Sequence, residues 1–117
     1  MEGKAISRYV RSSPRRARLV ADLVRGLPVE EAYAVLQYCR KRAATPVLKT
    51  LRSAVSNALS SAGTLQLRVE DLRIAELRID EGPALKRFRA MSMGRVGRVR
   101  RRTSHITVVV TSATGRV

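Results

Sequence analysis

The sequence is poor in aromatic residues, cysteine and long apolar runs. Aromatic side chains make up 3% of its 117 residues, with one Phe and no Trp, so a base-stacking platform of the RRM or OB type is poorly supplied. The single cysteine, Cys39, excludes an internal disulfide framework and fits a reducing compartment. No run approaches the roughly 20 apolar residues that cross a bilayer, and the N-terminus shows no signal-peptide pattern. We therefore expect a cytoplasmic protein with an aliphatic core.

Acidic residues are also missing from the last quarter of the chain. The formal net charge is +15, of which residues 1–25 carry +5, residues 26–85 carry +1 and residues 86–117 carry +9. The stretch Arg87–Arg102, "RFRAMSMGRVGRVRRR", contains seven arginines and no acid. Arginine forms forked hydrogen bonds to phosphate, so the pattern favours a polyanionic partner. Because the stretch has no amphipathic apolar face, nucleic acid is favoured over a membrane surface.

The periodicity of apolar residues predicts three helices between extended segments. A Ser-Pro start at Ser13 and Pro14 with a Gly26 stop is typical of a helix. In the next helix Glu30 and Glu31 occupy the first turn, and a basic run is expected in its last turn. The predicted helices cover residues 14–25, 28–42 and 45–62, and the predicted strands cover residues 4–10, 72–80 and 104–112. These elements predict a single α+β domain, residues 1–117, with three helices packed on a three-stranded antiparallel sheet.

The segment between the last two predicted strands is too long for a tight turn. If both strands continue outward they form a protruding basic hairpin over about residues 82–102, whose tip would lie about 30 Å from the body at roughly 3.3 Å per residue. Such a ribbon is marginal alone in water, and its like charges repel, so it requires a negatively charged environment.

Catalytic and metal sites are not indicated. The sequence offers no nucleophile–base set, no phosphate-binding glycine loop and no metal-ligand cluster, because His105 and Cys39 are single copies. We interpret His105 as a structural or RNA-facing side chain. The residues bear on three classes of protein: a structural RNA-binding protein, a general nucleic-acid binder such as a small DNA-binding protein, and an enzyme. The third has no support in the residues, and no cofactor or metal is expected.

Four segments in order along the chain resemble one known family. "KAISRYVRSSPRRARLVADLVRG", "SAVSNA", "IDEGPALKR" and "RRTSHITVVV" are similar to the large-subunit ribosomal protein family L-twenty-two of bacteria. The resemblance implies a fold of three helices against a three-stranded antiparallel sheet with a long hairpin. It implies large-subunit rRNA and neighbouring ribosomal proteins as partners, a role in subunit assembly, and a hairpin tip in the wall of the exit tunnel beside the nascent polypeptide. It implies a bacterial-type ribosomal location, with no membrane partner and no small-molecule substrate.

The resemblance also assigns site residues. The residues that it places against rRNA are Arg8, Arg11, Arg15, Arg16, Arg18, Lys86, Arg87, Arg95, Arg98, Arg100, Arg101, Arg102, Ser104 and His105. The residues that it places at the tunnel tip are Arg89, Ala90, Met91, Ser92, Met93 and Gly94.

The tip departs from the family pattern, which usually has Pro-Arg-Ala and then Lys or Arg before the glycine. Met91 and Met93 stand where cations are usual, and they are interpreted either as apolar filler or as adaptable surface contacts, with the second favoured.

Overall fold

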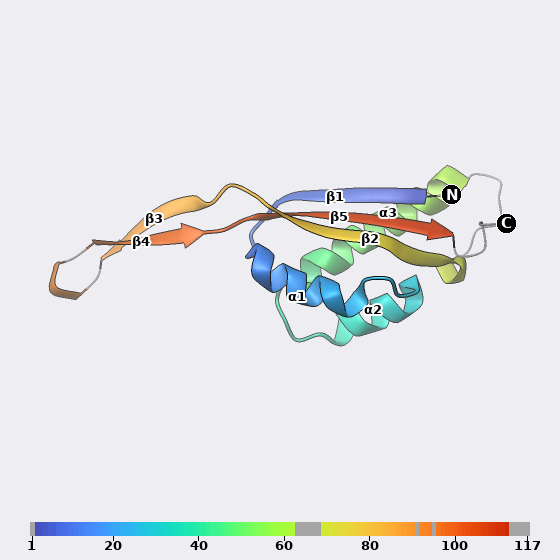
Figure 1. Cartoon of the computed structure of the whole chain (residues 1–117), viewed down its shortest axis with the longest axis horizontal. Coiled ribbons are helices and arrows are strands. Elements are labelled where there is room, and N and C mark those ends of the chain that lie inside the picture. The colour runs from blue at the N-terminus through green and yellow to red at the C-terminus, as the bar shows by residue number, and fades with distance from the viewer. Residues whose placement is uncertain (1, 63–68, 91, 95, 113–117) are drawn as a thin grey trace.

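The computed structural model describes residues 2–62, 69–90, 92–94 and 96–112. It is an α+β fold in which three helices cover one face of a three-stranded antiparallel sheet, and a second, two-stranded sheet extends away from them (Figure 1). In chain order the elements are β1 (Glu2–Val10), α1 (Pro14–Val24), α2 (Val29–Tyr38), α3 (Ala44–Ala62), a 3₁₀ turn (Val69–Asp71), β2 (Leu72–Glu81), β3 (Leu85–Ala90), a second 3₁₀ turn (Ser92–Gly94), β4 (Val96–Arg101) and β5 (Ser104–Ser112). The predicted fold class is therefore confirmed.

The central strand of the larger sheet is β5, which lies between β1 and β2. Its β-branched residues suit a pleated surface, and Ile106, Val108 and Val110 turn toward the helices, where they are fully buried. Val108 lies opposite Ala5 on β1 and opposite Leu77 on β2, and these three residues form one buried row of the core.

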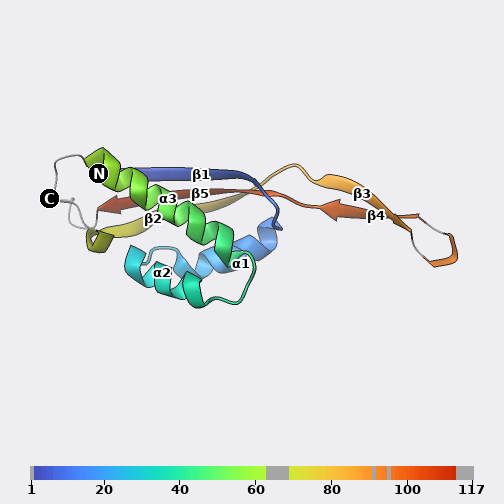
Figure 2. The same ribbon diagram turned by 180° about the vertical axis from the view of Figure 1, so that it is seen from behind.

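Helix α3 crosses the back of the sheet and packs closely on β1 (Figure 2). Gly3 permits this approach, because a Cβ at that position would collide with the Ala54 carbonyl oxygen and with Ala58. Two polar contacts fix the same interface: the hydroxyls of Ser7 and Thr50 are 2.6 Å apart, and the Asn57 amide donates to the Lys4 carbonyl oxygen at 2.8 Å. Small residues on both elements, Gly3 on β1 and Ala54 and Ala58 on α3, thus allow strand and helix to touch.

Helix α2 is shorter than predicted. It ends at Tyr38, and Cys39 follows with an extended backbone (φ −74°, ψ 128°). The expectation that residues 40–42 complete its last turn is therefore wrong, and these cations lie in the loop that returns the chain to α3. On the part of α2 that packs toward α3, burial raises the pKa of the Tyr33 phenol, an effect that the positive charge of Arg52 partly offsets.

Strands β3 and β4 form the separate two-stranded sheet. They pair antiparallel from Leu85 with Arg101 to Ala90 with Val96, inside the hairpin predicted over residues 82–102. The hairpin projects along the long axis of a molecule that measures 66 × 24 × 17 Å (Figures 1 and 2). At its end Met93 and Gly94 have positive φ angles of 62° and 73°.

Candidate nucleic-acid interface

A groove lies where the body of the protein meets the base of the hairpin. Three separate segments contribute to its lining: the chain that follows β1 and enters α1, the loop between α2 and α3 with the first turn of α3, and the hairpin base. The lining residues of the three segments are Arg11, Ser12, Ser13, Arg16 and Leu19; Lys41, Arg42, Ala43 and Pro46; and Leu85, Arg101, Arg102 and Thr103. None of the lining residues is acidic. The cations of the groove are Arg11, Arg16, Lys41, Arg42, Arg101 and Arg102.

These six side chains, here called the groove cations, are almost without acidic partners. Among the described residues, the only ion pair that involves one of them joins Arg102 to Glu81 at 3.5 Å, and both side chains are more than half exposed. An exposed pair of this kind contributes little stability. The other groove cations therefore repel one another in the free protein, and a polyanion in the groove would relieve that repulsion.

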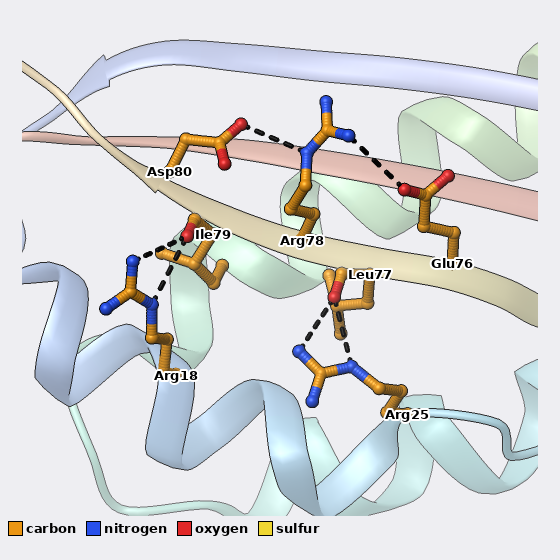
Figure 3. A network of polar contacts seen from close by, with 7 residues as sticks. All are labelled: Arg18, Arg25, Glu76, Leu77, Arg78, Ile79 and Asp80. Carbon is orange, nitrogen blue, oxygen red and sulfur yellow. Dashed lines mark hydrogen bonds and ion pairs between the residues drawn. The ribbon is translucent and has the colours of Figure 1, made fainter.

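Helix α1 also carries arginines that point away from the groove. Arg18 donates from Nε and from an Nη to the Ile79 carbonyl oxygen at 3.3 and 3.1 Å, and Arg25 donates in the same way to the Leu77 carbonyl oxygen at 3.1 and 2.8 Å (Figure 3). Both acceptors belong to β2, an outer strand of the sheet. Arg18 and Arg25 thus cap backbone carbonyls of a strand for which the described sheet provides a neighbouring strand on one side only, β5.

His105 holds an irregular point in β1 directly before the groove. Its Nδ1 accepts the Tyr9 backbone N–H at 3.1 Å, and the two rings meet edge to face with centroids 5.1 Å apart. Tyr9 has a positive φ of 57°, and the register of β1 with β5 shifts between Ser7 and Val10. Accepting at Nδ1 leaves the ring proton of neutral His105 on Nε2.

Two bonds join the two arms of the hairpin to each other where they leave the body. The Gly82 N–H donates to the Thr103 carbonyl oxygen at 3.0 Å, and the Thr103 hydroxyl donates to the Pro83 carbonyl oxygen at 2.6 Å. Ser104, the first residue of β5, is fully buried, and its hydroxyl has no partner among the described atoms.

Apolar side chains are exposed along the outer hairpin. Phe88 is 71% exposed, Val96 is 68% exposed and Met93, at the tip, is 95% exposed. Exposed apolar side chains that are gathered on one segment are typical of a surface that contacts a partner.

Comparison with known proteins agrees with this geometry. The sequence pattern of the ribosomal protein L22p/L17e family matches residues 5–111. The chain belongs to this family. It is 50% identical over 117 residues to the large ribosomal subunit protein uL22 of Bifidobacterium animalis subsp. lactis, with 98% of each chain covered. The proteins of the same name from Clostridium novyi and Halothermothrix orenii are 52% and 46% identical over 110 residues, with 94% of this chain and 96% and 95% of theirs covered.

Membership of the L22p/L17e family determines the class of the protein. The chain is a ribosomal structural protein of bacterial type and not an enzyme. No helix in the described part of the chain is long and apolar enough to cross a membrane.

The structure brings together four of the residues that the resemblance assigns to rRNA: Arg11, Arg16, Arg101 and Arg102 line the groove. Arg8, Arg15 and Lys86 are exposed outside its lining. Arg18 instead bonds β2, and His105 instead bonds Tyr9. Ser104 is fully buried and offers no side-chain surface to a ligand, so it is not carried into the proposed contact set.

The remaining predicted residues are on the hairpin. Arg87, Arg98 and Arg100 take part in the backbone pairing of β3 and β4, as do Arg89 and Ala90, while Ser92 begins the turn at the tip. Met91 and Arg95 lie outside the described residues.

Two groove cations were missed by the sequence interpretation, which placed Lys41 and Arg42 at the end of a helix. A signal was available, since Thr45 and Pro46 mark the start of the next helix and leave little room for α2 to continue. The direction in which the loop carries these side chains depends on how α2 and α3 pack, which the sequence pattern alone does not contain.

Proposed function

We propose that the protein is a structural constituent of the large ribosomal subunit that binds large-subunit rRNA through its groove and its arginine-rich hairpin and supports subunit assembly. The observation that carries the proposal is the groove, in which cations from three separate segments converge without an acidic residue in its lining. Arginine supplies five of the six cations, as forked binding of phosphate favours. In this proposal residues 1–117 act as one binding unit, with the hairpin of residues 82–102 as its extension.

The hairpin tip is proposed to lie in the wall of the nascent-peptide exit tunnel. Its projection along the 66 Å axis supports a role at a distance from the body. Met93 is almost fully exposed at a turn, so it would make soft apolar contacts with bases, neighbouring ribosomal protein or a passing nascent chain. The tip residues in this proposal are Arg89, Ala90, Met91, Ser92, Met93 and Gly94.

Sedimentation of a tagged chain expressed in bacterial cells tests the assignment. We expect the tag to cosediment with large subunits through a sucrose gradient, and a density map of those subunits to show the groove against rRNA. The matched control is the same tag on a chain with residues 86–100 replaced by a short glycine-containing turn, which is expected to incorporate less well. A tagged chain that instead fractionates with DNA, or stays free at the top of the gradient, would overturn the proposal.

A further inference from the structure

The loop between α2 and α3 brings two cations, Lys41 and Arg42, to the groove. Neither cation stabilises another part of the described fold through an ion pair or a side-chain hydrogen bond. We propose that Lys41 and Arg42 form a third RNA-binding element, and that one continuous stretch of RNA backbone lies in the groove and contacts the body and the hairpin base together. This inference rests on the proposed binding of rRNA and names the loop residues that take part in it.

Stabilisation of a helix end does not explain these two cations. Basic residues are favourable in the last turn of a helix, where the carbonyl groups carry partial negative charge. Helix α2 ends at Tyr38 and has no basic residue in its last turn. Lys41 and Arg42 are exposed in the following loop, and neither makes an ion pair or a side-chain hydrogen bond with any other residue that the structure describes.

Their position adds a third wall to the groove. The segment at the start of α1 supplies Arg11 and Arg16, the hairpin base supplies Arg101 and Arg102, and the loop completes the lining. The backbone of an RNA strand suits such a groove, because its negative charges repeat along its length. Successive phosphates can therefore bind cations from all three segments. Ser12 and Ser13 add hydroxyl groups to the lining, and Leu19, Pro46 and Leu85 add apolar surface suited to the sugars.

An RNA strand in this position would also fix the direction of the hairpin. The base of the hairpin is held by the two bonds between Thr103 and the segment Gly82–Pro83 and by the exposed pair of Arg102 with Glu81. Phosphates bound jointly by the loop and by Arg101 and Arg102 would tie the hairpin to the body from outside the protein chain. The free protein supplies no equivalent tie from Lys41 or Arg42.

Salt-dependent binding to a transcript of bacterial large-subunit rRNA tests the inference. In the full chain, Lys41→Gln combined with Arg42→Gln is expected to make the slope of log affinity against log salt shallower by about 1.4 to 1.8, which corresponds to two lost phosphate contacts. The matched control combines Arg40→Gln with Lys49→Gln, two exposed cations outside the groove lining with the same change in net charge. The control is expected to leave the slope within about 0.5 of the wild-type value.

A double-mutant cycle tests whether one strand contacts loop and hairpin base together. Arg42→Gln and Arg101→Gln are expected to be coupled by at least about twofold in affinity, whereas Arg40→Gln and Arg101→Gln are expected to be additive. Arg42→Lys retains the charge and is expected to keep the wild-type slope. The thermal unfolding midpoint of each variant is expected to equal the wild-type midpoint. Equal midpoints would show that the loop changes do not act through folding.

The outcomes separate the inference from the proposed function. A wild-type chain that shows no salt-dependent affinity for the transcript would overturn both. Wild-type binding with a loop variant that behaves like the control would overturn the loop assignment alone. Competition by a glutamate-rich peptide as strong as that by the unlabelled transcript would overturn RNA as the occupant and assign the groove to an acidic protein segment.

Discussion

Tyr9 adopts a backbone conformation that its side chain disfavours. A positive φ at a residue other than glycine costs about 1 kcal/mol or more, and at Tyr9 the cost is offset by the bond from its N–H to His105 and by the contact of the two rings. The bulge redirects the chain two residues before Arg11, the first groove cation. His105 therefore positions the entrance to the groove from a different strand.

Replacement of His105 by alanine is predicted to lower the free energy of unfolding by about 0.5–1.5 kcal/mol, because the exposed Tyr9 N–H exchanges its protein acceptor for water and the ring contact is lost. Tyr9→Gly in the same background is expected to recover part of the loss, since glycine adopts positive φ freely. Urea unfolding measures both effects. Asp80→Ala is the control, because Asp80 lies opposite His105 on β2 but does not bond Tyr9. Equal losses in His105→Ala and Asp80→Ala would contradict the positioning role.

At the scale of the secondary-structure element, the arginines of α1 and of its C-cap have two different roles. Arg16 lines the groove, whereas Arg18 and Arg25 donate to carbonyls of β2. Residues two apart on a helix point in directions about 160° apart around the helix axis, so Arg16 and Arg18 cannot face the same partner. One helix thereby presents a cation to the groove on one side and donates hydrogen bonds to the sheet on the other.

The two tasks of α1 predict opposite phenotypes. Arg18→Ala is expected to reduce the free energy of unfolding by about 0.5–1.5 kcal/mol and to leave the salt slope of rRNA binding nearly unchanged. Arg16→Ala is expected to leave stability within about 0.5 kcal/mol of wild type and to make that slope shallower by about 0.7–0.9. Chemical denaturation and filter binding on the same preparations distinguish the two. If Arg18→Ala made the salt slope of rRNA binding shallower without lowering the free energy of unfolding, Arg18 would be assigned to RNA binding and not to the sheet.

Most elements could be predicted because their local signals agree with their packing. The β-branched run of β5 and the Ser-Pro start of α1 mark those elements in the sequence. The end of α2 was predicted too late, because the basic residues at positions 40–42 satisfy the rule for a helix end although the chain has already left the helix at Cys39. The sequence pointed to the basic segments of the site but could not show which arginine meets β2 and which meets the groove, since that depends on how α1 rotates against the sheet.

The hairpin is predicted to be dispensable for folding of the body. Strands β3 and β4 form their own sheet, so replacing residues 86–100 by a short glycine-containing turn should leave a cooperative unfolding transition, with a midpoint within about 4 °C of the wild-type value. Affinity for rRNA should fall, with a slope shallower by roughly 0.7 to 0.9 for each phosphate contact removed. Calorimetry and binding measure the two properties separately. Loss of cooperative unfolding would show that the hairpin belongs to the core.

At the scale of the whole molecule, the charge of +15 acts in opposite directions on folding and on binding. In the free protein the groove cations and the hairpin arginines repel one another, and added salt screens that repulsion. In the proposed RNA complex the same charges would displace counterions, and added salt would restore those counterions to the RNA. Salt should therefore stabilise the protein while it weakens the complex.

We predict that the unfolding midpoint of the free protein rises between about 0.05 and 0.5 M KCl, the range over which the screening length shortens several-fold. Over the same range log affinity for rRNA should fall with a slope of about −4 to −5, as expected for neutralisation of roughly six phosphates. Differential scanning calorimetry measures the salt dependence of the unfolding midpoint, and equilibrium binding measures the salt dependence of the affinity. An affinity that is independent of salt would contradict the electrostatic basis of the site.

The arginine caps on β2 also bear on the time between synthesis and incorporation. An outer strand with free carbonyls is a template on which another copy can pair, and copies that add edge to edge grow into insoluble aggregates. Arg18 and Arg25 occupy the carbonyls of Ile79 and Leu77 with groups that cannot continue a β-ladder. Two carbonyls of β2 are therefore occupied by side chains of the protein's own fold, and this part of the outer strand is less able to template the addition of another copy.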